Sequence, residues 1–139
     1  MAYLISIPWW LKRLHNKGLI WSRSTKHKCI YLSFDDGPHP IITNFVLDTL
    51  KENGIKATFF CIGDNVLKYP ETFERIIKEQ HTVGNHTHNH LNGWKTDNIQ
   101  YYKNILQAAK YIPSKLFRPP YGKIKPTQAN YLLKRGWRI

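Results

Sequence analysis

Two groups of residues in this 139-residue chain have the types and spacing of a metal centre. Asp35 and Asp36 directly follow an apolar run, and His86 and His90 lie four residues apart, fifty residues further along. Residues four apart share one face of a helical turn, so both imidazoles can reach one ion while His88 points elsewhere. One carboxylate with two imidazoles leaves coordination positions open, which suits a catalytic zinc or a non-haem iron. The second carboxylate is then left for proton transfer.

The elements expected around these residues place them at strand ends. Residues 29–34 and 57–62 are β-branched and aromatic runs that predict strands, and residues 82–85 predict a short strand leading into His86. The Gly-Pro pair after the aspartates predicts a turn, where both carboxylates could face one cavity. The aspartates are therefore expected just beyond the end of the first strand.

Apolar residues at helical spacing predict helices between the strands, near residues 42–52, from 70, from 97 and over 126–135. The side chains expected on their inner faces are Ile42, Phe45, Val46, Thr49 and Leu50; Phe73, Ile76 and Ile77; Tyr102, Ile105, Leu106 and Ala109; and Leu132 and Leu133. Residues 116–118 and 137–139 predict two more short strands. This alternation predicts an α/β fold, with parallel strands and outer helices.

The composition indicates one globular domain with a strongly basic, uneven charge. The formal net charge is +12, and no acidic residue occurs before Asp35 or after Asp97. Polyanions are compatible partners by charge, but no RNA-binding signature or zinc-finger spacing is present, so no nucleic-acid partner is expected. Cys29 and Cys61 fall in predicted strands and are expected to be buried and reduced.

Residues 1–27 are expected to form a basic and aromatic arm that packs on a domain of residues 28–139. Its apolar stretch is short, is interrupted by Pro8 and precedes its positive charges, so neither a signal peptide nor a membrane-spanning helix is recognised. A cytoplasmic or cell-envelope location is compatible with this, and the oligomeric state stays open.

Four ordered motifs resemble the polysaccharide deacetylase family, also known as the NodB homology domain. They are SFDDGP (33–38), ATFFCIGDN (57–65), GNHTHNH (84–90) and FRPPYG (117–122). The resemblance implies a distorted (β/α) barrel and metal-dependent removal of N- or O-linked acetyl groups from carbohydrate, so an acetylated glycan is the expected partner.

The resemblance also implies a role for particular residues. These are a general base at Asp35, metal ligands at Asp36, His86 and His90, an orienting Arg118, an oxyanion-binding backbone N–H at Tyr121 and a supporting hydroxyl at Thr87. Zn2+ is the expected metal, and Co2+, Ni2+, Mn2+ and Fe2+ are compatible. The ion would activate a water for attack on the acetyl carbonyl.

One feature departs from the family pattern. Family domains continue through further strands to an Asp and Trp motif and a Leu-His motif whose histidine is the general acid, whereas this sequence stops at Ile139. We therefore expect a truncated form, with an unclosed barrel and weak or no activity. A catalytically silent metal- and glycan-binding remnant is one alternative. An iron oxygenase with the same ligand set is another, against which the doubled aspartate and the motif order argue.

Overall fold

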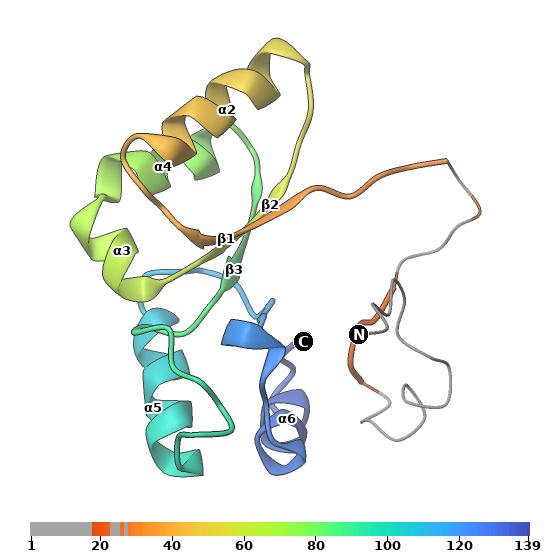
Figure 1. The fold of residues 1–139 in the computed structure, drawn as a ribbon, viewed down its shortest axis with the longest axis vertical. Coiled ribbons are helices and arrows are strands. Elements are labelled where there is room, and N and C mark those ends of the chain that lie inside the picture. Colours follow the sequence, from red (N-terminus) through yellow and green to blue (C-terminus); the bar gives the residue numbers. More distant parts are fainter. Residues whose placement is uncertain (1–17, 23–25, 27) are drawn as a thin grey trace, which may run out of the picture.

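The computed structural model describes residues 18–22, 26 and 28–139. A parallel sheet lies at its centre, formed by β1 (Ser33–Gly37), β2 (Thr58–Cys61) and β3 (Thr82–Asn85) in that order. Two isolated parallel bridges, Asn85 to Phe117 and Leu116 to Arg138, continue the same arrangement. Strands in chain order with helices between them form part of a (β/α) barrel, as predicted (Figure 1).

The connecting helices are α2 (Ile42–Glu52), α3 (Gly63–Lys68), α4 (Pro70–Lys78), α5 (Asn98–Ala108) and α6 (Pro126–Leu133), with a 3-10 turn at η1 (Pro120–Gly122). Helices α2 to α4 group at one end of the molecule, and α5 and α6 at the other (Figure 1). The sequence did not predict α3 or η1, because both are too short to show an apolar period. No helix in the described part of the chain is long and apolar enough to cross a membrane.

The hydrophobic interior has two parts, which correspond to these two groups of helices. The first includes Leu47, Phe59, Val66, Phe73 and Ile76, between the sheet and α2 to α4. The second comprises Tyr101, Ile105, Phe117, Leu132 and Trp137, around α5, α6 and the later strand segments. Burial of each such side chain contributes about 1.5–3 kcal/mol, so both helix groups are held against the strands that carry the polar motifs.

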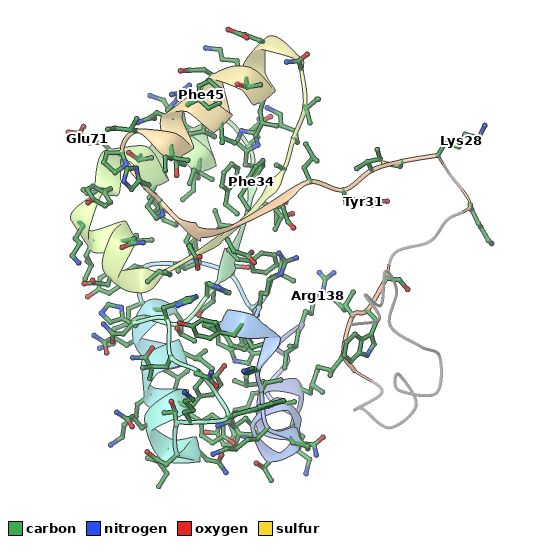
Figure 2. All side chains as sticks on the ribbon, in the orientation of Figure 1. Lys28, Tyr31, Phe34, Phe45, Glu71 and Arg138 are labelled. Atoms are coloured by element: carbon green, nitrogen blue, oxygen red, sulfur yellow. The ribbon has the colours of Figure 1, made fainter. Side chains whose placement is uncertain are left out.

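The predicted inner face of α2 is partly wrong. Thr43, Leu47 and Leu50 are buried, whereas Ile42 and Phe45 are 62% and 69% exposed (Figure 2). Apolar residues lie on more than one face of this helix, so the sequence alone does not decide which face is buried. The backbone N–H of His39 donates to Thr43 Oγ1 at 2.8 Å, which helps to hold Thr43 inward.

The inner face of α5 is also displaced from the prediction. Tyr101, Ile105 and Ala108 are buried, and Leu106 is exposed. Tyr102 is half-buried because its ring stacks on Tyr131, with centroids 3.8 Å apart. Because two tyrosines are adjacent, the sequence pattern allows either of them to lie on the inner face of α5. The contact with Tyr131 on α6 decides between them.

The first strand begins later than predicted and contains both aspartates. Ser33 and Phe34 pair with Thr58 and Phe59, whereas residues 28–32 extend away from the helices (Figures 1 and 2). Ile30 and Tyr31 are therefore exposed, and so is Cys29, contrary to the prediction. High β-propensity produces a strand only where a neighbour pairs with it.

Most of the predicted N-terminal arm, residues 1–27, lies outside the described residues, which include only 18–22 and 26 of it. Within that part, the backbone N–H of Ile20 donates to the carbonyl of Ile139 at 2.6 Å.

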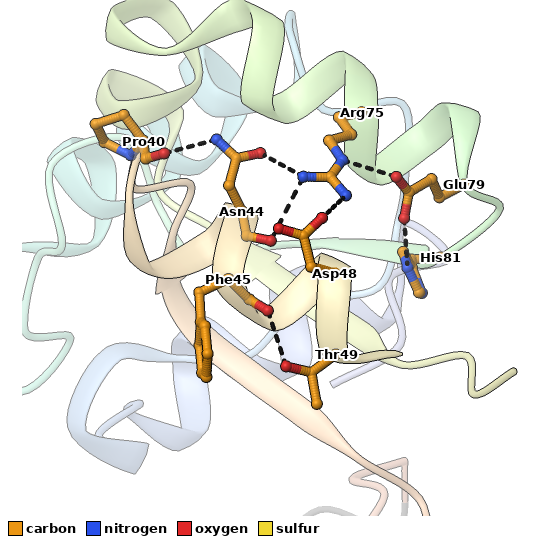
Figure 3. A network of polar contacts seen from close by, with 8 residues as sticks. All are labelled: Pro40, Asn44, Phe45, Asp48, Thr49, Arg75, Glu79 and His81. Carbon is orange, nitrogen blue, oxygen red and sulfur yellow. Dashed lines mark hydrogen bonds and ion pairs between the residues drawn. The ribbon is translucent and has the colours of Figure 1, made fainter. Parts of the chain in front are cut away.

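A polar network joins α2 to α4 (Figure 3). Arg75 on α4 donates to Asp48 Oδ1 at 2.5 Å and to Asn44 Oδ1 at 3.0 Å on α2, and to Glu79 Oε1 at 2.7 Å. Glu79 Oε2 faces His81 Nε2 at 3.9 Å, directly before β3. The network therefore fixes the relative position of the two helices that cover β1 and β2.

The contrast between the two cysteines is testable. Burial raises the pKa of the Cys61 thiol to about 12, so its reactive thiolate form is scarce at about pH 8. Ellman's reagent should modify Cys29 at once and Cys61 only when a denaturant is added. The variant Cys29→Ser should show no rapid reaction. Two rapidly reacting thiols in the folded parent chain would show that Cys61 is not buried.

Candidate metal centre and active site

A β-bulge in β1 separates the two aspartates. The pairing with β2 shifts between Phe34 and Gly37, and Asp36 has a left-handed backbone with φ of 66°. Asn65 Nδ2 donates to the carbonyl of Asp36 at 2.8 Å, which helps to hold this conformation. Because a bulge changes the direction of side chains, adjacent residues can serve different partners. The change of direction therefore occurs at Asp36, one residue before the Gly-Pro turn to which the sequence analysis attributed it.

Asp36, His86 and His90 converge at one point. Asp36 Oδ1 lies 3.4 Å from His86 Nε2 and 3.0 Å from His90 Nε2. The three potential ligand atoms all lie within 4.8 Å of one another, and no other group of this kind occurs among the described residues. The structure thus brings together the three predicted ligands, and one carboxylate with two imidazoles fits a divalent cation such as Zn2+.

The histidines converge for a different reason from the one predicted. Residues 86–90 form a loop, not a helical turn, and Thr87 and His90 have left-handed backbones with φ of 65° and 55°. His88 does point elsewhere: its ring is buried and stacks on Tyr111, with centroids 6.4 Å apart. The spacing thus predicted that the two rings converge, but bends in the loop, and not helical periodicity, bring them together.

A hydrogen bond fixes the orientation of the His86 ring. His86 Nδ1 lies 2.7 Å from the carbonyl oxygen of Arg118. A carbonyl can only accept, so Nδ1 carries the hydrogen and Nε2 presents its lone pair toward Asp36. Burial lowers the pKa of His86, and this bond to Arg118 opposes the shift. The ring is thus favoured in the neutral form that binds a metal.

Asp35 does not belong to the cluster of Asp36, His86 and His90, and it pairs with Arg118. Arg118 Nη1 donates to Asp35 Oδ1 at 2.8 Å and to Ser33 Oγ at 3.0 Å. The guanidinium also lies 4.0 Å from the centroid of the Phe60 ring, so three groups determine its position. Asp35 is therefore a fixed carboxylate next to the metal cluster, and it is not one of the three clustered ligands.

Tyr121 lies next to His90. Its exposed ring is 4.7 Å from the His90 ring, and its backbone is left-handed with φ of 59°. Within the described part of the chain, no acceptor is found for the Tyr121 backbone N–H. This N–H can therefore serve as a donor to another molecule.

A cavity of about 430 Å³ extends from Arg118 and Ser33 to Trp94. Trp94 is 60% exposed, yet its Nε1 donates to the carbonyl of Ile124 at 3.2 Å, and Lys123 Nζ lies 5.2 Å from its ring. The sequence analysis did not identify Trp94. An aromatic residue within the polar stretch that follows GNHTHNH was the only signal available.

The ligand assignment predicts opposite effects for two histidine substitutions. His90→Ala removes one of three ligands and should weaken Co2+ binding by more than about 100-fold, since outer-shell partners alone contribute about 10- to 100-fold. His88→Ala removes a buried ring and should lower the unfolding free energy of the apoprotein by about 2 kcal/mol, with one ion still bound. Calorimetric titration and thermal unfolding measure the two effects. Equal loss of metal binding in both variants would overturn the ligand assignment.

Comparisons with known proteins identify the family and the fold. The polysaccharide deacetylase profile matches residues 22–139. A peptidoglycan-N-acetylglucosamine deacetylase from Bacillus cereus is 38% identical over 117 residues, which are 79% of this chain and 42% of that protein. The solved structure of a peptidoglycan N-acetylglucosamine deacetylase in complex with 4-naphthalen-1-yl-N-oxidanyl-benzamide superimposes with a TM-score of 0.77 at 36% identity, covering 78% of this chain and 54% of that one.

A family 4 acetyl xylan esterase from Clostridium thermocellum, solved with a cobalt ion, gives a TM-score of 0.66 at 33% identity, covering 72% of this chain and 52% of that one. The chain thus spans about half the length of these relatives. The matches confirm the predicted fold and family: this chain belongs to the polysaccharide deacetylase family.

Proposed function

We propose that this chain carries the metal and proton-transfer residues of a hydrolase that removes acetyl groups from carbohydrate. The observation that carries the proposal is the Asp36, His86 and His90 cluster beside the separate Asp35–Arg118 pair. Cleavage of N-acetyl groups, at a carbon–nitrogen bond that is not a peptide bond, is the reaction proposed first. The names of the Bacillus cereus and Clostridium thermocellum relatives support N-acetylated and O-acetylated glycans, respectively.

The proposed chemistry gives each residue a distinct role. Asp36, His86 and His90 would hold a divalent cation, with Zn2+ proposed as the native ion. When bound there, such an ion supplies Lewis acidity toward the acetyl carbonyl and the attacking water. The cobalt in the esterase structure supports a divalent metal in this family.

Asp35 would accept the proton of the attacking water. The contact with Arg118 holds the carboxylate in position for this transfer. As the water oxygen bonds to the acetyl carbon, negative charge develops on the carbonyl oxygen. The Tyr121 backbone N–H would donate to it, and one such donor contributes about 3–4 kcal/mol to catalysis. As the bond to the acetyl carbon breaks, the proton held by Asp35 would pass to the leaving nitrogen, or to the leaving oxygen of an ester. The products are acetate and the free amino or hydroxyl group.

Two other functions would use the same ligands. An iron oxygenase can bind its metal through two histidines and one carboxylate, but it has no evident use for the Arg118-bound carboxylate beside them. A catalytically silent protein that binds metal and glycan would keep the whole arrangement without turnover. The assay of acetate release below distinguishes this case from a deacetylase.

Substitution of Asp35 tests the division of roles between the two aspartates. In a Zn2+-loaded form of the domain extended to full length, Asp35→Asn should leave metal stoichiometry unchanged. It should reduce acetate release from chito-oligosaccharide or an acetyl ester by about 10²- to 10⁴-fold, the usual contribution of a general base. Asp64→Asn, on α3, is a matched control that should retain full activity. Loss of metal in Asp35→Asn would mean that the roles of the two aspartates are reversed. Metal and glycan binding without acetate release in the parent chain would favour the silent alternative.

The glycan is proposed to extend along the cavity toward Trp94. The bond to Ile124 and the contact with Lys123 hold this exposed ring in place, as expected of a surface on which a sugar ring can pack. Trp94→Ala should weaken chito-oligosaccharide binding by about three- to tenfold, the contribution of one aromatic contact. Phe45→Ala, a matched change of an exposed aromatic residue on α2, should have no effect in the same calorimetric titration. An unchanged affinity in Trp94→Ala would place the glycan elsewhere.

A further inference from the structure

The loop that carries the two histidine ligands depends on hydrogen bonds from outside itself. Thr87 and His90 both have left-handed backbones, a conformation that costs a non-glycine residue about 1–2 kcal/mol. Such a conformation persists where surrounding groups determine it. Two asparagine side chains, Asn85 and Asn104, supply most of the side-chain bonds to this loop.

Asn104, in the middle of α5, makes three of these bonds. Its Oδ1 accepts from the backbone N–H groups of His88 at 2.8 Å and Asn89 at 3.1 Å. Its Nδ2 donates to Asn89 Oδ1 at 2.8 Å. One amide thus binds two successive backbone groups and one side chain, all located between His86 and His90.

Asn85 connects the start of the loop to the same turn of α5. It is fully buried, and its Oδ1 accepts from the Thr87 backbone N–H at 2.8 Å. Its Nδ2 donates to the carbonyl of Ile105 at 3.0 Å, one residue beyond Asn104. The loop is therefore attached at two adjacent points of α5, through Asn85 at Thr87 and through Asn104 at His88 and Asn89.

We propose that Asn104 is a positioning residue for the metal, assisted by Asn85: it keeps the loop in the conformation that aims His86 and His90 at the same point. This inference rests on the metal site of the proposed function. His86 is aligned independently, by its bond to Arg118. Among the described residues no such bond is found for His90, so its position depends on the path of residues 87–90. Loss of the Asn104 bonds would let these residues adopt other backbone conformations, and the ion would then have to order the ligands on binding.

The chemistry of the side chain suggests how to test the inference. Aspartate at this position retains the oxygens that accept from both backbone N–H groups and loses only the donor to Asn89. Leucine has a similar size and makes none of the three bonds. Gln107→Leu provides a matched control, because Gln107 is exposed on the same helix and no side-chain hydrogen bond is found for it in the described structure.

The experiment measures Co2+ affinity by calorimetric titration, the visible absorption of the bound Co2+ and the Tm of the apoprotein. Asn104→Leu should raise the dissociation constant by about 10- to 100-fold and alter the absorption band, as expected for loss of an outer-shell partner. Asn104→Asp should stay within a few-fold of the parent chain, and Gln107→Leu should match it. Ile76→Val, in the other part of the core, should lower the Tm without changing the dissociation constant.

The outcomes separate the two proposals. If Asn104→Leu lowers the Tm as Ile76→Val does and binds Co2+ as tightly as the parent chain, Asn104 has only a structural role and the positioning proposal is wrong, while the metal site stands. If the parent chain itself binds no Co2+, both the metal site and the positioning role are wrong.

Discussion

The pairing of residues 116–118 with the end of β3 determines most of the site geometry. The Arg118 backbone N–H donates to the carbonyl of Asn85 at 3.0 Å, and the Arg118 carbonyl accepts from His86. The Arg118 side chain reaches across the sheet to Asp35 on β1. One residue thus aligns a metal ligand with its backbone and the proposed base with its side chain. The distance between His86 and Asp35 is therefore set by the register of the strands, and side-chain motion changes it little.

Backbone strain is concentrated at this site. Of the five non-glycine residues with positive φ in the described chain, four are Asp36, Thr87, His90 and Tyr121. Each supplies or adjoins a group that the proposed reaction uses. Such conformations are stable only where external bonds hold them, and the bonds from Asn65, Asn85 and Asn104 do this for the bulge and the histidine loop. The polar residues near the site are thus needed as much for the shape of the backbone as for chemistry.

The sequence was most informative where residue identity alone carries the chemistry. The structure groups Asp36, His86 and His90, pairs Asp35 with Arg118 and has the predicted parallel strand order. Strand ends at one edge of a parallel sheet lie close together whatever the details of the loops, so these contacts could be expected from order alone.

The sequence was less informative where a contact between distant residues decides the local conformation. The bulge at Asp36 and the loop at 86–90 depend on Asn65 and Asn104, and no periodic pattern links those residues to the motifs. The inner faces of α2 and α5 were displaced for a similar reason, because each helix carries apolar residues on more than one side. Tertiary contacts chose the face, and they override propensity.

The contacts that define the site all lie between Ser33 and Tyr121, on the strands of one sheet and the loops that follow them. The proposed metal binding and proton transfer therefore depend on this central part of the chain. The cavity toward Trp94 is also lined by Ile20, Trp21 and Ile139, which lie outside it in the sequence. The proposed metal site and the proposed glycan surface thus depend on different parts of the chain. A change in the residues that line the cavity can therefore alter that surface without altering the strand register that places Asp35, Asp36 and the two histidines.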